Sequence, residues 1–275
     1  MLAAQVTDNS YEGWQASLAL QFCHTPEKTL LHSARHIGPL TVQRPFYPEG
    51  ETCHLYLLHP PGGIVGGDTL DISVRLDAKS HALITMPGAS KFYRSSGPLA
   101  CLSQHFYLDE EATLEWLPQD TIIFPGANAA LRSVFHLKAS STLLAWELYC
   151  LGRPVIGETF SHGTLESRLE VWVDDEPRLI ERQHLGDGEL TPVAGHPWIG
   201  TLLFYPARED HLDTVRALLA PLGHFAGATL TDALLSVRFL SHDNLICQRA
   251  MRDIWQSLRP LLTTKTACSP RIWQT

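Results

Sequence analysis

The sequence predicts a mainly β protein, with a large layered or β-helix-like antiparallel body and two α-helices in the C-terminal third. Three observations carry this prediction. Short segments in which apolar and polar residues alternate recur from Gly13 to about Leu185. Proline, glycine and aspartate separate them at short intervals, which favours antiparallel strands over βαβ units. Two stretches after residue 200 have the apolar spacing of helices instead.

The N-terminal elements are simple to assign. Residues 1–10 are polar, and we expect a frayed end there. The first strand is predicted from Gly13 to Phe22, where every second residue is apolar. Thr29 to Ala34 is expected to continue the sheet. Prolines bound the segment 38–45, which suits an edge strand.

The middle of the chain holds most of the predicted β body. The same alternation and the same turn residues define its strands, which cover residues 51–59, 69–76, 81–86, 99–108, 113–117, 131–137, 142–151, 168–173 and 178–185. No sequence repeat of fixed period joins these segments, so the sequence does not support a true repeat array.

The last third changes character. Helical spacing covers Glu209 to Ala220 and Asn244 to Leu258, with Asn244 as a possible cap and Pro260 as the stop. A strand at 201–205 precedes the first helix, and a strand pair or one long strand at 228–240 precedes the second. We therefore predict a single domain over 11–275, with a β body at about 11–200 and a β-α-β-α tail at about 201–262.

The amino-acid composition limits the kinds of partner that we expect for this protein. Of the 275 residues, 44% are hydrophobic and 18% are charged, which is typical of a protein with a large core that works within a complex. The 29 acidic residues outnumber the 21 basic ones, for a net charge of −8. This balance argues against nucleic acid as the main partner.

The cysteines indicate the compartment. Six cysteines are spread along the chain without a C-x-x-C pair, which is typical of reduced thiols in a cytoplasmic protein. The N-terminus shows no signal-peptide pattern, and no apolar run is long enough to span a membrane. We therefore expect a cytoplasmic location and no membrane partner.

One loop is denser in turn residues than a hairpin needs. Its members are two prolines and four glycines, namely Pro60, Pro61, Gly62, Gly63, Gly66 and Gly67. Asp68 follows at once, and strand patterns lie on both sides. The spacing fits neither the dinucleotide fingerprint nor a Walker A loop. The loop is therefore either a structural corner or a shaped loop that places Asp68 at a defined point.

Three carboxylates stand out by position. Asp68 ends the glycine loop, whereas Glu147 and Glu181 lie within apolar strand patterns. An isolated buried charge is very costly, so each must be paired, hydrated or bound to metal. For Glu147 and Glu181, one alternative is a salt bridge to Arg153, Arg168 or Arg182. The other is a hydrated, oxygen-lined passage for a divalent cation, whose loose ligands can pass an ion on.

Other chemistry has weaker support. The 14 histidines form no H-x-H, H-E-x-x-H or Cys/His cluster, so we expect no preformed tight metal site and no tightly bound cofactor. A triad built on Ser90 lacks the G-x-S-x-G elbow of hydrolases. A hydrolase-type enzyme that uses the glycine loop and Asp68 stays open as an alternative.

An ordered series of motifs resembles the urease accessory protein D family, called UreD, or UreH in some species. The motifs are LHPPGGIVGGD at 58–68, TMPGASKFYR at 85–94, LEWLPQD at 114–120, FPGAN at 124–128, GRP at 152–154 and GE at 157–158. The resemblance runs from about Gly13 to the second helix and beyond. One glycine loop alone would be a weak signal, but the series is specific.

The resemblance implies a non-enzymatic urease maturation factor. Members of this family bind the urease apoprotein and the accessory proteins F and G, of which G is a GTPase. They help deliver nickel to an active site where a carbamylated lysine bridges two nickel ions. The family fold is mainly β with two helices, and nickel is thought to pass through an internal tunnel.

The resemblance also implies roles for individual residues. Asp68 and Ser90 lie in matched motifs and are predicted to line the tunnel, with nickel in transit. Glu147 and Glu181 are predicted to line it as well, mostly because they are carboxylates within apolar strand patterns. Lys91, Tyr93 and Arg94 are expected to shape the loop or to contact partners. The competing interpretations are the hydrolase above and a protein-binding β scaffold without a metal role.

Overall fold

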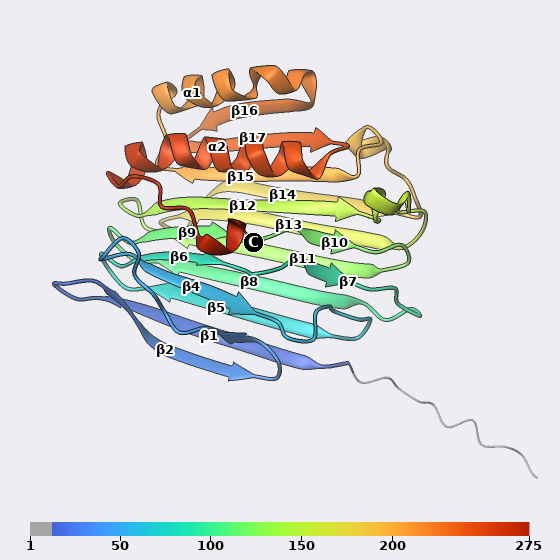
Figure 1. Cartoon of the computed structure of the whole chain (residues 1–275), viewed down its shortest axis with the longest axis horizontal. Helices are drawn as coiled ribbons and strands as arrows, with labels where there is room; N and C mark the ends of the chain where they lie inside the picture. The colour runs from blue at the N-terminus through green and yellow to red at the C-terminus, as the bar shows by residue number, and fades with distance from the viewer. Residues whose placement is uncertain (1–12, 275) are drawn as a thin grey trace, which may run out of the picture.

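The computed structural model describes residues 13–274, and its strands form two stacked sheets (Figure 1). The seven-stranded sheet has the order β14-β13-β11-β8-β5-β1-β2. Its strands are β1 (Gln15–His24), β2 (Thr29–Ile37), β5 (Thr69–Leu76), β8 (Ala100–Leu108), β11 (Asn128–Leu137), β13 (Thr164–Val173) and β14 (Glu176–Gly186).

The ten-stranded sheet has the main path β16-β17-β15-β12-β9-β6-β4-β3, and β7 and β10 pair beside β12. Its strands are β3 (Thr41–Val42), β4 (Cys53–Leu58), β6 (His81–Thr85), β7 (Ser90–Phe92), β9 (Thr113–Leu117), β10 (Thr121–Ile123), β12 (Thr142–Leu151), β15 (Trp198–Tyr205), β16 (Ala226–Thr231) and β17 (Leu234–Ser241). The mainly β class, the layered form and the expected edge strand near residue 41 are confirmed.

The pairing direction inside the β body differs from the prediction. Neighbouring strands β1-β5-β8-β11-β13 are all parallel, and so are β4-β6-β9-β12. Antiparallel pairs occur at the ends, as in β1–β2, β13–β14, β12–β15, β15–β17 and β16–β17. The predicted antiparallel body is therefore wrong in this respect, and the strands stack as in a β-solenoid.

The short turns explain the error. After β5 and β8 the chain turns within four residues, at Asp77–Ser80 and Asp109–Ala112, with positive φ at Lys79 and Glu111. Such turns are typical of hairpins. Here each turn carries the chain to the opposite sheet instead, so alternate strands return parallel to one another. The strands of each sheet recur at intervals of about 30 residues without a matching sequence repeat.

A third, short series of parallel strand pairs closes one side of the solenoid that the two sheets form. Ile64 pairs in parallel with Phe92, Ile122 and Ile123 of β10 pair with Lys91 and Phe92, and β10 pairs with the end of β12. The glycine-rich loop is thus the first rung of a small parallel stack. It forms a structural corner, as one of the two interpretations of the loop expected.

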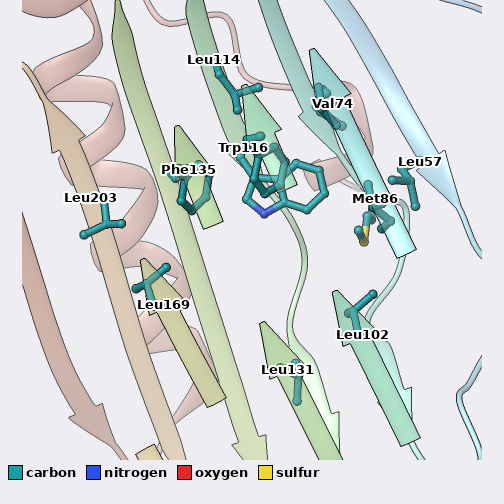
Figure 2. Packing of buried hydrophobic residues seen from close by; sticks show 14 of the residues in the cluster. Leu57, Val74, Met86, Leu102, Leu114, Trp116, Leu131, Phe135, Leu169 and Leu203 are labelled. Atoms are coloured by element: carbon teal, nitrogen blue, oxygen red, sulfur yellow. The ribbon is translucent and has the colours of Figure 1, made fainter. Parts of the chain in front are cut away.

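The main core lies between the two sheets (Figure 2). Alternate residues of each strand point inward, so leucine, valine and isoleucine from both sheets interdigitate with a few large rings. Phe106 stacks on Phe135, with ring centroids 4.5 Å apart, and Trp116 packs against Phe106 at 4.8 Å. Burial of these side chains supplies most of the drive to fold.

The helices cover the outer face of the ten-stranded sheet. In Figure 1, α2 (Asn244–Thr263) runs along β15 and β17 and also contacts β12, and α1 (Glu209–Leu219) lies along β16. Together they bury a second apolar cluster that includes Leu212, Val215 and Trp255. Four short 3₁₀ segments cover 154–156, 191–193, 220–225 and 271–274. No helix within residues 13–274 has the length and apolarity needed to cross a membrane.

Both helices match the sequence prediction, with two corrections to α2. The N-cap is Asp243, whose Oδ1 accepts a hydrogen bond from Leu245 N at 2.8 Å, and not Asn244. Pro260 does not stop the helix, which continues to Thr263. Because Pro260 lies only one turn from the helix end, a single lost backbone bond is tolerated there.

A buried ionic network holds α2 on the sheet. The Arg259 guanidinium has no exposed surface, and its Nε lies 3.0 Å from both oxygens of Glu115 on β9. Its other nitrogens donate to Glu49, at 2.7 and 2.8 Å. Trp255 Nε1 and His81 Nε2 each lie 2.7 Å from a Glu115 oxygen. Sequence reasoning identified none of these residues as a network.

Candidate functional site

A polar strip interrupts the apolar core between the two sheets. Glu147 of β12 points inward and is partly buried between the sheets, and its Oε1 accepts a hydrogen bond from Ser133 of β11 at 2.5 Å. Its Oε2 accepts the Tyr149 hydroxyl at 2.8 Å. Gln104 of β8 extends the strip by donating to Ser133 Oγ at 3.2 Å. Four side chains from three strands therefore form a connected network inside the sandwich.

Burial governs the electrostatics of the strip. Burial raises the pKa of Glu147, and the nearby charge of Glu181 adds to this effect, whereas the hydrogen bonds of Ser133 and Tyr149 and the charge of Arg238 oppose it. Burial and the adjacent Glu147 carboxylate also raise the pKa of Tyr149 well above its ordinary value. A positive charge placed at Glu147 would relieve the cost of its burial.

Two cavities meet at Glu147. A cavity of about 380 Å³ is lined by Glu147, Tyr149, Glu181 and Arg238. A cavity of about 20 Å³, enough for roughly one water molecule, is lined by Ser90, Gln104, Glu147 and Tyr149. Of the four residues predicted to line a passage, Ser90 borders the smaller cavity, Glu181 borders the larger one, and Glu147 borders both.

Glu147 and Glu181 form no salt bridge with the arginines that the sequence suggested as partners, Arg153, Arg168 and Arg182. Glu181 on β14 pairs with Arg238 on β17 across the larger cavity. Glu147 has the Ser133 and Tyr149 hydroxyls as partners and no ion pair in the described part of the chain. Arg153 pairs with Glu158, and Arg168 pairs with Glu170. The strand order of the folded chain brings these partners together.

Asp68, the fourth residue predicted to line a passage, lies outside the linings of both cavities. Its Oδ1 accepts a hydrogen bond from the backbone N–H of Trp14 at 2.8 Å, and its Oδ2 accepts one from Val65 at 2.9 Å. The side chain is 6% exposed and lines neither of the two cavities. In this geometry Asp68 closes the glycine-rich loop and joins it to the start of β1.

The glycines of the loop allow close packing. A Cβ on Gly63 would lie 2.0 Å from Cε2 of Tyr93, and one on Gly66 would lie 2.1 Å from Oγ of Ser95. Tyr93 in turn packs edge-on against Phe124, with ring centroids 4.9 Å apart. The backbone of Lys91 accepts a hydrogen bond from Ile64 N, and Arg94 lies beside Gly126. These contacts support a loop-shaping role for Tyr93.

We expect Gly63→Ala to lower the free energy of unfolding by about 1–3 kcal/mol, because the new methyl group must displace the Tyr93 ring. Urea unfolding measures this loss. Tyr93→Ala removes the clash, so the double variant should lose less than the sum of the two single variants. Strict additivity would show that Gly63 and Tyr93 are not coupled.

The strip offers weak oxygen ligands and no closed metal cage. Within residues 13–274, no group of three or more histidine, cysteine, aspartate or glutamate side chains is arranged to hold a metal ion. Two carboxylates, one phenol and the hydroxyls of four serine or threonine residues border the cavities instead, namely Glu147, Glu181, Tyr149, Ser90, Thr121, Ser167 and Thr201. Oxygen ligands of this kind can make transient contacts with a divalent cation.

Sequence reasoning missed Gln104, Ser133 and Arg238. A signal for the first two exists. Gln104 and Ser133 occupy positions of apolar alternation, between Leu102 and Phe106 and between Leu131 and Phe135. A polar residue on the apolar face of a strand indicates a buried polar contact. Arg238 carries no comparable signal, because only the tertiary fold brings β17 near β14.

Comparison with known proteins agrees with the motif series. The sequence model of the UreD urease accessory protein family matches residues 15–274. The chain is 80% identical over 263 residues to the urease accessory protein UreD of Enterobacter sp. (strain 638), and the match covers 96% of each chain. It is 69% identical to the UreD of Klebsiella aerogenes, over 96% of this chain and 98% of the relative.

A more distant relative matches over the full length. The urease accessory protein UreD of Pseudomonas putida (strain GB-1) is 52% identical over 275 residues, which is 100% of this chain and 99% of that one. The relatives are named as accessory proteins, which agrees with the interpretation of this chain as a non-catalytic factor and not an enzyme. The chain belongs to the UreD urease accessory protein family.

Proposed function

We propose that this protein is a cytoplasmic urease maturation factor that binds the urease apoprotein and accessory proteins F and G. We further propose that nickel passes through its interior on the way to the urease active site. Membership of the UreD family supports the maturation role. The six free cysteines fit a reducing compartment.

The position of Glu147 is the observation that carries the passage. This carboxylate borders both the small cavity at Ser90 and the larger one at Glu181. Its burial favours exchange of a proton for a cation, and its oxygen partners are neutral hydroxyls. A nickel ion would therefore meet a ligand that attracts it without a cage that retains it. The hydrogen bonds of Asp68 to the backbone favour a structural role for that residue instead.

The proposal is tested by measuring how fast urease is activated by variants of this protein in which a cavity-lining carboxylate is replaced. Glu147→Gln keeps the size of the side chain and one acceptor oxygen but removes its charge, and its NH2 group must donate to one of the two hydroxyls that the carboxylate accepted from. In a reconstituted mixture of urease apoprotein, accessory proteins F and G, GTP, bicarbonate and limiting nickel, we expect activation to slow by about tenfold or more. Glu181→Gln is expected to slow it less, because Glu181 lies at the open end of the cavity.

The control variant is Glu176→Gln, an exposed carboxylate on the same strand as Glu181. It should activate urease at the wild-type rate. Co-purification of the complex separates the alternatives. Slow activation with intact assembly supports a passage, whereas loss of assembly supports a scaffold without a metal role. Wild-type activation by both Glu147→Gln and Glu181→Gln would contradict a route past these carboxylates.

A further inference from the structure

A hollow opens where four strands of the seven-stranded sheet end. Because β5, β8, β11 and β13 run parallel to one another, their C-terminal ends lie along one edge of that sheet. The hollow has a volume of about 510 Å³, within the range of ligand pockets, about 300–1,000 Å³. Planar side chains from the four strands line it, together with charged residues of the turns that follow them.

The planar side chains form a row across the four strands. Strand register aligns Arg75, Tyr107, His136 and Trp172 on neighbouring strands. The Tyr107 and His136 rings are stacked, with centroids 5.0 Å apart. The Arg75 guanidinium lies 4.1 Å from the centroid of the Tyr107 ring, and it lies on the side opposite His136 because β8 is between β5 and β11. The row thus already holds one guanidinium group by cation–π stacking.

The second face of His136 has no ring against it. Register makes Trp172 its neighbour, but the Trp172 indole N–H donates to Glu170 at 3.1 Å, so the indole leans back along β13. Among residues 13–274, no ring contact joins His136 to Trp172. Burial lowers the pKa of His136 below its ordinary value, despite the opposing charges of Asp175 and Glu170. The ring is therefore neutral at pH 7 and does not repel a cation.

The edge that holds the hollow carries an excess of negative charge. The four strand ends and their turns, residues 75–80, 107–112, 136–141 and 172–178, contain seven carboxylates and four lysines or arginines. The inner rows of the same outer face are balanced instead, and their charged residues are Asp71, Glu166, Glu170, Arg132, Arg168 and Arg182. The excess therefore belongs to the edge and not to the whole face.

One carboxylate of the hollow has no cation of its own. Both lysines at this edge are already paired with carboxylates, at 4.0 and 3.8 Å, and Arg75 is stacked on Tyr107. Within residues 13–274, no ion pair includes Asp175, and its side chain is exposed. Asp175 lines the same hollow as His136, and its charge acts on that ring. The hollow therefore presents an open aromatic face and an unpaired carboxylate together.

We propose that this hollow is the docking site for an arginine side chain on a basic segment of a partner protein. The guanidinium stacks on the open face of His136, as Arg75 stacks on Tyr107, and pairs with the Asp175 carboxylate. Arginine suits both contacts better than lysine does, because its planar group stacks on aromatic rings and bonds carboxylates in a bidentate manner.

The extent of the negative edge favours a protein segment over a free small cation. The edge covers three strand spacings from β5 to β13, about 14 Å, which is longer than a single guanidinium group. A metal ion fits less well, because the described residues hold no group of three acidic, histidine or cysteine side chains arranged to bind one. The same negative charge repels phosphate groups, so the edge selects a basic peptide over a nucleic acid.

A binding assay with three synthetic peptides tests the site without urease or nickel, so its result is independent of the proposed passage. The fluorescent probe is a nine-residue peptide of glycine and serine that carries one arginine between two lysines. In the two comparison peptides, citrulline or lysine replaces the arginine. Citrulline keeps the planar shape without the charge, whereas lysine keeps the charge without the plane.

Fluorescence anisotropy with the full chain at low ionic strength measures the three dissociation constants. We expect the arginine peptide to bind about tenfold more tightly than the citrulline peptide and about threefold more tightly than the lysine peptide. Its affinity should fall as the salt concentration rises. Equal binding of the arginine and citrulline peptides would overturn the proposal, and so would equal binding of the arginine and lysine peptides.

Substitutions locate the site on the chain. Asp175→Asn should remove most of the advantage of arginine over citrulline. The matched control is Asp187→Asn, because Asp187 is also exposed, also has a positive φ and follows the other end of β14. Asparagine tolerates this backbone conformation, so both variants should fold, and thermal unfolding checks that they do. His136→Leu should remove the advantage of arginine over lysine. Equal effects of Asp175→Asn and Asp187→Asn would overturn the proposal.

Discussion

Replacing Arg259 by alanine is expected to lower the free energy of unfolding by about 3–5 kcal/mol, because it leaves buried carboxylates without their cation. Arg259 is fully buried and contacts both oxygens of Glu115 and both of Glu49. Glu115 itself has no exposed surface. Urea unfolding of the purified chain measures the loss as a lower midpoint.

The matched control is Arg249→Ala, an exposed arginine on the same helix. Its effect should stay within about 0.5 kcal/mol of wild type. Arg259→Met tests whether charge or volume matters, since methionine fills part of the space but leaves the carboxylates unpaired. A loss below about 1 kcal/mol for Arg259→Ala, as for a surface ion pair, would contradict the assigned role of the network.

The protein is expected to lose about 3 kcal/mol of stability as the pH falls from about 5 to about 2, through protonation of Glu115 alone. Burial tends to raise the pKa of Glu115, but the hydrogen bond and charge of His81 and the charge of Arg259 lower it to about 2, from 4.5. The folded state therefore binds this proton less readily than the unfolded state. The stabilisation is complete above the unfolded pKa and is lost as the pH approaches the folded pKa.

Urea midpoints across this pH range measure the effect. Glu115→Gln cannot titrate, so its stability should be lower at neutral pH and should decline less in acid than that of wild type. Glu110→Gln, in an exposed turn, should follow the wild-type curve. The neighbouring Glu49, whose pKa is also lowered, adds to the acid loss in all these variants. An identical decline in Glu115→Gln and wild type would show that Glu115 does not govern it.

The sequence predicted the elements of the fold better than their connections. Alternation located the strand at Thr69–Leu76, because one face is buried in either kind of sheet. The same alternation fits parallel and antiparallel pairing, and the turn at Asp77–Ser80 has the length of a hairpin loop. Only the packing of two sheets against each other decides that this turn crosses between them.

The sequence also predicted only part of the candidate site. The apolar context of Glu147 was sufficient to identify a buried carboxylate. Its partner Ser133 could not be identified, because Ser133 lies on a strand of the opposite sheet, whereas Tyr149 lies two residues away on the same face of β12. For Asp68 the sequence identified a motif but not the contacts of the side chain. This residue lies in one of the motifs that carry the family resemblance, yet both of its oxygens accept hydrogen bonds from backbone N–H groups.

By itself, the sequence determined the mainly β class, the two C-terminal helices, the family and the presence of inward carboxylates. These features follow from local periodicity and ordered motifs, which are properties of neighbouring residues. The tertiary structure alone decided the parallel stacking, the Arg238–Glu181 pair, the Arg259–Glu115 network and the register that aligns Arg132, Arg168 and Arg182 on neighbouring strands. Each of these joins residues from strands or helices far apart in the chain, and period-2 alternation carries no information about which strands become neighbours.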